Sequence, residues 1–156
     1  MSIKIETTEI IKTDFNENVV TVLPVSSNES DLHNYSSTAL SFWKYARRDI
    51  DIELLSEPKT LVEQRSGEWF GPMILITSSL LSGNSALVSV LCGVVSNYLT
   101  DFFKGKIDEP VIKLKVLYKE TKSSKTTEIS YEGDIQGIER LEQSILEVVK
   151  KGNEKR

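Results

Sequence analysis

The pattern of hydrophobic and polar residues changes most over Gly71–Thr100, a run without a single charge that lies between Glu68 and Asp101. Over Met73–Val95 the run is apolar enough for a membrane span, which needs about twenty residues. Its middle, Ser82–Ser85, consists of small or polar residues that are costly at a bilayer centre and include the helix-ending types Gly and Asn. The pattern therefore predicts two segments, a short apolar lead-in followed by a helix.

After this break, apolar and polar residues separate onto two sides of the predicted helix. The apolar side is formed by Leu87, Val90, Leu91, Val94, Val95, Tyr98, Leu99, Phe102 and Phe103. Such a stripe is typical of a helix with one face in a soluble core, and it favours that interpretation over membrane insertion. The opposite side carries small uncharged side chains, which permit close approach of another backbone. We expect a helix-packing or oligomer face there, formed by Ser85, Ser89, Gly93 and Ser96.

Shorter patterns predict the elements of the N-terminal part. Alternation over Ile3–Ile5 indicates a strand or an extended arm, and the β-branched run Val19–Leu23 indicates a central strand buried on both faces. Helical spacing predicts a helix of about four turns over Leu32–Arg48, with Tyr35 in its apolar stripe. Ile50–Leu54 alternates with acidic residues and predicts a half-exposed strand.

The C-terminal part has the clearest pattern. Val111–Tyr131 contains two alternating segments around a polar turn, which predicts a β-hairpin with one apolar and one solvated face. Asp134 is a candidate N-cap, and the apolar stripe over Ile138–Val149 predicts a last helix that packs on the hairpin. Residues 151–156 are charged and predict a frayed, disordered tail.

Together these elements predict one α+β domain over residues 1–150. The order is strand, helix, strand, a short strand at Leu61–Arg65, a long apolar helix, a hairpin and a final helix. Strands interleaved with helices and followed by an antiparallel hairpin are typical of a two-layer α/β sandwich with a mixed sheet, here around a long apolar central helix.

Composition and charge narrow the classes of function. The net charge is −4, which argues against a general nucleic-acid binder, and no cluster of basic and aromatic residues is visible. Cys92 is the only cysteine and His33 the only histidine, so neither a disulfide within the chain nor a usual zinc site is expected. The start of the sequence lacks the pattern of a cleavable signal peptide. We therefore expect a cytoplasmic protein, with inner-membrane association as the alternative.

The sequence contains no motif for an enzyme. A nucleophile would need Cys92 or a serine beside a base, and Cys92 lies next to the apolar stripe, where an inert buried thiol is the simpler interpretation. Three carboxylates alternate along one predicted strand and have the chemistry of a magnesium site, but they equally fit a solvated strand face. These are Asp49, Asp51 and Glu53. We expect no catalytic residue, no metal and no cofactor.

The most suggestive side chains for binding are two aromatics. Trp69 and Phe70 lie in the segment Ser66–Pro72, whose glycines and proline predict a loop. Large aromatics beside the charged residues Arg65 and Glu68 are typical hot-spot material for a protein partner. The alternative is that the two aromatics close the end of the core.

The second half of the chain resembles a known family. Its features are the aromatic Gly loop Gly67–Gly71, the long Ala/Val/Leu/Ser/Gly helix, the basic stop Lys104–Lys106, the strand-turn-strand Val111–Tyr131 and a final helix. Over about residues 60–150 this arrangement is similar to the effector-associated constant components of bacterial conflict systems. These are small α+β proteins inferred to act as adaptors, encoded beside variable effector genes.

The resemblance implies a non-enzymatic adaptor or accessory subunit of a bacterial antiphage defence or conflict system. Its partner would be a protein, encoded by a neighbouring gene, and a homo-oligomer is a further expectation. A membrane-acting effector that inserts residues 73–103 is the first alternative. An immunity-type inhibitor of a toxin is the second, because an acidic protein suits a basic toxin.

Overall fold

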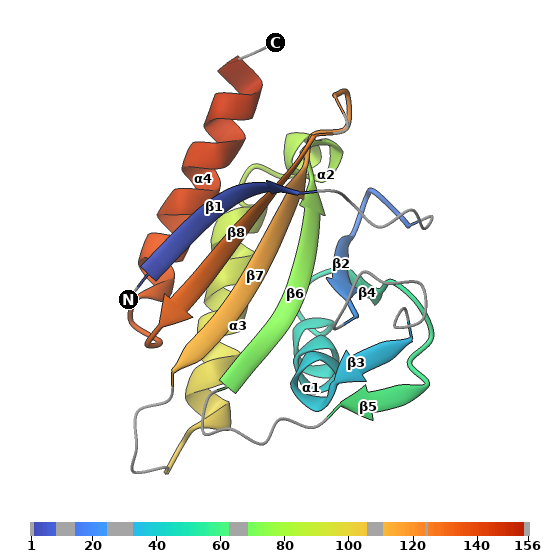
Figure 1. Cartoon of the computed structure of the whole chain (residues 1–156), viewed down its shortest axis with the longest axis vertical. Coiled ribbons are helices and arrows are strands. Elements are labelled where there is room, and N and C mark those ends of the chain that lie inside the picture. The colour runs from blue at the N-terminus through green and yellow to red at the C-terminus, as the bar shows by residue number, and fades with distance from the viewer. Residues whose placement is uncertain are drawn as a thin grey trace.

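The main sheet has six strands in the order β1-β8-β7-β6-β2-β4 (Figure 1). Its members are β1 (Ser2–Thr8), β2 (Val20–Leu23), β4 (Ile52–Leu54), β6 (Trp69–Thr77), β7 (Ile112–Lys119) and β8 (Thr126–Gly133). A second, two-stranded sheet pairs β3 (Asn34–Ser36) with β5 (Thr60–Val62). The computed structural model describes residues 2–8, 15–24, 33–62, 69–105, 111–123 and 125–154, which carry all of these elements.

Helices connect the strands and cover one face of the main sheet (Figure 1). The parallel pair β2 and β4 is joined through β3 and α1 (Ser37–Ala46), and the parallel pair β6 and β7 through α2 (Ser78–Gly83) and α3 (Leu87–Phe102). β7 and β8 form an antiparallel hairpin, β1 pairs antiparallel with β8, and α4 (Ile138–Glu154) follows β8. The protein is a two-layer α/β sandwich of the α+β class with a mixed sheet, as the sequence predicts.

The sheet is apolar on both faces near its centre. One large core fills the space between the sheet and the helices, and its members on β6 are Ile74 and Ile76. A smaller cluster on the opposite face contains the buried leucines Leu23, Leu75 and Leu117. Because successive strand residues point to opposite faces, β2 and β6 need apolar side chains at nearly every position. All four residues of β2 are buried, as the continuous pattern of that strand predicts.

The hairpin and the last helix match their predictions. β7 and β8 pair in register from Ile112 to Lys119, and the buried stripe of α4 contains Ile138, Leu141 and Ile145. The Asp134 carboxylate accepts a hydrogen bond from the Gly137 backbone N–H in the turn before α4. α4 contacts β8 and α3, and it continues to Glu154, into the segment for which the sequence predicts a tail.

The prediction of a loop over Ser66–Pro72 is wrong from Trp69 onward, because β6 begins there; residues 66–68 lie outside the described residues, and the apolar lead-in predicted after the loop continues the same strand. Trp69 and Phe70 are the first residues of that strand, and their backbones pair with Ile112 and Lys113 of β7. A continuous apolar run suits a strand buried on both faces as well as a helix, so periodicity could not separate the two. The uncharged run is one strand and two helices, and in the described residues no helix has the length and apolar character needed to span a membrane.

Two helices differ in detail from their predicted patterns. α1 begins at Ser37 and not near Leu32, because the Ser36 hydroxyl accepts a hydrogen bond from the Ala39 backbone N–H and Tyr35 belongs to β3. In α3 the buried stripe is rotated. Val88 and Cys92 are buried, whereas Val90 and Phe102 are 42% and 38% exposed. α3 packs between α1 and α4, so the positions of these two neighbours decide which side of it is covered.

Candidate functional site

An exposed cluster of aromatic and charged side chains lies where the C-terminal ends of α1 and α3 meet. It consists of Tyr45 on α1, Arg48 just after α1, and Asp101 and Phe102 at the end of α3. Arg48, Asp101 and Phe102 are exposed and Tyr45 is half-buried. We name these four residues the aromatic–arginine patch.

Local contacts order the patch. The Arg48 guanidinium lies 4.8 Å from the centre of the Tyr45 ring, and its Nε donates a hydrogen bond to the Tyr45 carbonyl at 3.3 Å. The Tyr45 hydroxyl donates to Oδ2 of Asp101 at 3.3 Å, which joins α1 to α3. Desolvation, followed by the charge of Asp101, raises the pKa of the Tyr45 hydroxyl, so this group stays a neutral donor at ordinary pH.

A buried tyrosine supports the patch from below. The Tyr98 ring lies 5.5 Å from that of Tyr45 and 5.8 Å from that of Phe102, measured between centroids. Its hydroxyl donates to Ser41 Oγ at 2.9 Å, and its ring packs edge-on against the buried Phe42. Phe102 is therefore exposed and yet packed on a side chain that the core holds in place.

The sequence pattern does not predict this patch. It places Tyr98 and Phe102 in the apolar stripe of one helix and Arg48 at the end of another. The spacing of Tyr98 and Phe102 puts their rings on adjacent turns, but only the packing of α1 on α3 brings Tyr45 to them. The available signal is a pair of large aromatics next to a charged residue, which is common in helices without any function.

The residues predicted for a protein contact have different outcomes. Arg65 and Glu68 lie outside the described residues. Trp69 and Phe70 form the beginning of β6, at the same end of the molecule as the C-terminal end of α3 (Figure 1). The backbone therefore places the predicted aromatics and the aromatic–arginine patch at one end of the fold.

The predicted small-residue face lies on the outer side of α3. Ser89 and Gly93 are exposed, Ser96 is half-buried, and the exposed Ser85 comes just before the helix. A Cβ built on Gly93 would have no described atom within 4 Å, so the helix neighbours do not require a glycine at this position. A role for this face in oligomerisation stays a prediction.

The groups considered for catalysis lie on different elements, with Cys92 on α3, His33 just before β3 and Glu53 on β4. Burial raises the pKa of the Cys92 thiol to about 12, with a smaller contribution from Glu142, so the thiol is protonated at neutral pH. His33 Nδ1 is within hydrogen-bond distance of the Glu57 carbonyl, at 2.7 Å. Of the three acidic residues considered for a metal only Glu53 lies on β4, and the described residues contain no group of three His, Cys, Asp or Glu placed to hold a metal ion.

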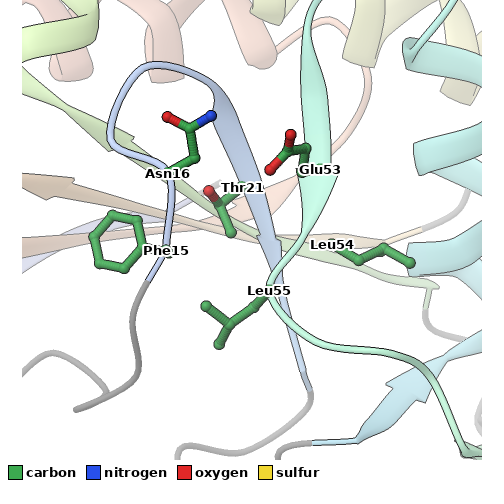
Figure 2. Close-up of a pocket in the computed structure, with 6 residues that line it drawn as sticks. All are labelled: Phe15, Asn16, Thr21, Glu53, Leu54 and Leu55. Carbon is green, nitrogen blue, oxygen red and sulfur yellow. The ribbon is translucent and has the colours of Figure 1, made fainter.

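A shallow cleft of about 330 Å³ opens beside β2 and β4 (Figure 2). It is lined by Phe15, Asn16, Thr21, Glu53, Leu54 and Leu55. Among these described lining residues Glu53 is the only titratable one, and Thr21 is almost fully buried. This set of residues therefore lacks the pair of acid and base that proton-transfer chemistry needs.

The comparisons with known proteins do not assign the chain to a family. No protein-family model, no curated protein and no solved structure matches it.

Proposed function

We propose that this protein is a non-enzymatic adaptor or accessory subunit that binds a protein partner through the end of the fold that carries the aromatic–arginine patch. The observation that supports the proposal is the exposed Phe102, which packs against the buried Tyr98 beside the ordered Tyr45–Arg48 pair. Tyr and Arg are enriched among residues that dominate the binding energy of protein interfaces.

Order within the patch supports a binding role. A long side chain that is immobilised on binding loses rotamer entropy of about 0.5 to 1.5 kcal/mol. The cation–π contact and the hydrogen bonds of Arg48 and Tyr45 already restrict these two side chains in the free protein. Less entropy is then lost when a partner covers them.

The kind of system is proposed from the sequence resemblance over residues 60–150. The resemblance implies an adaptor of a bacterial defence or conflict system, whose partner would be the product of a neighbouring gene. Trp69 and Phe70 belong to the same proposal, because their backbone lies at the patch end of β6 (Figure 1). Arg65 and Glu68 are proposed as charged contacts around them.

Binding experiments with the products of the flanking genes test the proposal. Each product is co-purified with the tagged chain, and the affinity is measured by calorimetry for the protein and for Phe102→Ala and Arg48→Ala. We expect each substitution to weaken binding about tenfold or more, which corresponds to about 1.4 kcal/mol. Trp69→Ala is expected to weaken it as well.

A matched control comes from another exposed apolar side chain. Leu146 on α4 is 41% exposed, close to the value of Phe102, and Leu146→Ala should leave the affinity unchanged. If no flanking product binds, the adaptor proposal is wrong. If Leu146→Ala weakens binding as much as Phe102→Ala, the contact surface has been placed incorrectly.

A further inference from the structure

The first strand, β1, is an edge strand of the main sheet. β1 is the last strand of the main sheet, and within the described residues β8 is its only strand neighbour (Figure 1). Alternate residues of an edge strand direct their backbone N–H and C=O groups away from the sheet, where they are free to pair with another strand. The side chains of β1 are also largely exposed, and Ile5 is 50% exposed.

We propose that a second copy of this chain pairs with β1 in antiparallel orientation, with the two-fold axis at Ile5. In this register Lys4 lies opposite the partner's Glu6, and Ile5 lies opposite the partner's Ile5. Ile3 lies opposite the partner's Thr7 in the same way. The strand is therefore complementary to itself in charge, and the pairing joins two six-stranded sheets into one.

The side of β1 that pairs with β8 supports this register. Glu6 lies directly opposite Glu128 of β8, and like charges in such positions repel each other. In the free chain, Lys4 Nζ forms an ion pair with Glu6 Oε1 at 2.8 Å along the same strand. The dimer would place the partner's Lys4 on the open side of Glu6, where a second positive charge offsets the repulsion from Glu128.

Neighbouring registers place like charges opposite each other. An axis at Lys4 would place two lysines opposite each other, and an axis at Glu6 would place two glutamates opposite each other. The axis at Ile5 also brings the two half-exposed Ile5 side chains together. These lie on the face of the sheet that carries the helices, because Ile5 pairs with Ile129 of the main core.

A charge-exchange experiment on the full chain tests whether two copies of β1 pair with each other. Sedimentation equilibrium is run from low micromolar to millimolar concentrations on the protein, on Lys4→Glu and on Glu6→Lys. We expect a concentration-dependent dimer for the protein and at least tenfold weaker self-association for each variant. An equal mixture of the two variants should dimerise as well as the unchanged protein.

The charges of the two variants explain why the mixture should recover. With the axis at Ile5, Lys4→Glu presents carboxylates at positions 4 and 6, and Glu6→Lys presents ammonium groups at both positions. Position 4 of one strand faces position 6 of the other, so every facing pair in the mixed dimer has opposite charges. Each variant alone places like charges opposite each other.

The mixture also distinguishes an effect on pairing between two chains from the loss of the Lys4–Glu6 ion pair within one chain. Both variants lose the ion pair of Lys4 with Glu6, and mixing cannot restore a contact inside one strand. A monomer at every concentration overturns the proposal. A mixture that stays as weak as its components overturns the assignment of β1 as the contact between the two copies.

A disulfide tests the register. Residues opposite each other on antiparallel strands lie within the Cα distance that a disulfide requires. Ile5→Cys should therefore form a covalent dimer on mild oxidation. Lys4→Cys, placed opposite the partner's Glu6, should give a yield of covalent dimer at least tenfold lower. The only native thiol, Cys92, is buried and gives little background. Equal cross-linking of both variants contradicts the axis at Ile5.

Discussion

The two edges of the main sheet are finished in different ways. β4 is only three residues long, and the Trp43 indole Nε1 donates a hydrogen bond to the Ile52 carbonyl at 3.0 Å. This carbonyl points away from β2, because the neighbouring positions Asp51 and Leu55 make the bonds to that strand. β1 has seven residues, and in the described part of the chain it has a neighbouring strand on one side only.

The difference shows how one fold can block association at one edge and leave it available at the other. A short strand whose outer carbonyl is bonded to a side chain offers little to another chain. A longer edge strand with alternating charge offers a template whose register the charges can select. The edge of β4 is therefore part of the stable fold, and the edge of β1 is suited to an interface.

The largest expected effect is the difference in stability loss between a substitution on β8 and one on β1. Ile129 of β8 is fully buried and lies opposite the half-exposed Ile5. We expect Ile129→Ala to lower the free energy of unfolding by about 2 to 5 kcal/mol, because it leaves a cavity in the core. Ile5→Ala should cost less than about 1 kcal/mol. Urea unfolding at low protein concentration measures both, and equal losses would show that β1 is packed as tightly as β8.

Cys92 is a buried residue on α3, away from both edge strands, and its substitution tests the packing of the core. Its pKa is raised from 9.0 to about 12, so between these values the thiol is protonated in the folded protein and ionised in the unfolded chain. The unfolded chain then binds fewer protons, and stability falls as the pH rises above 9. Cys92→Ala should remove a slope of up to about 1.4 kcal/mol per pH unit from unfolding curves in this range. Identical slopes for the variant and the unchanged protein would contradict the burial of the thiol.

A smaller effect than that of Ile129→Ala should come from the edge at β4. Trp43→Phe keeps an aromatic ring beside β4 but removes the donor to the Ile52 carbonyl. We expect a loss of about 1 kcal/mol in the free energy of unfolding, as for one hydrogen bond, since water can reach part of this edge. Thermal and urea unfolding measure this loss. An unchanged stability would mean that the indole does not close the edge.

Much of the fold follows from local patterns. The alternation of β7 and β8 and the stripe of α4 are strong because each has one face in the core and one in water. β6 escapes prediction because a strand buried on both faces has no alternation to detect. The spacing of Tyr35 fits the stripe of α1, but the Ser36 cap begins that helix after it.

The candidate site is predictable only in part. The aromatic pair Trp69 and Phe70 is visible in the sequence, and its backbone proves to lie at the end of the fold that carries the patch (Figure 1). The patch itself joins Tyr45 to Asp101 across 56 positions of the chain. No local pattern reports a contact between residues so far apart, because it depends on the packing of one helix on another.

The uncharged run Gly71–Thr100 illustrates this division. By itself the sequence determined that the run is broken at Ser82–Ser85 and that the second part forms an amphipathic helix, because hydrophobic periodicity and helix-ending residues act locally. Only the tertiary structure decided that the first part is a strand followed by a short helix, which side of α3 is buried and which strands lie at the edges of the main sheet. Those features depend on the neighbours that each element finds, and such neighbours come from distant parts of the chain.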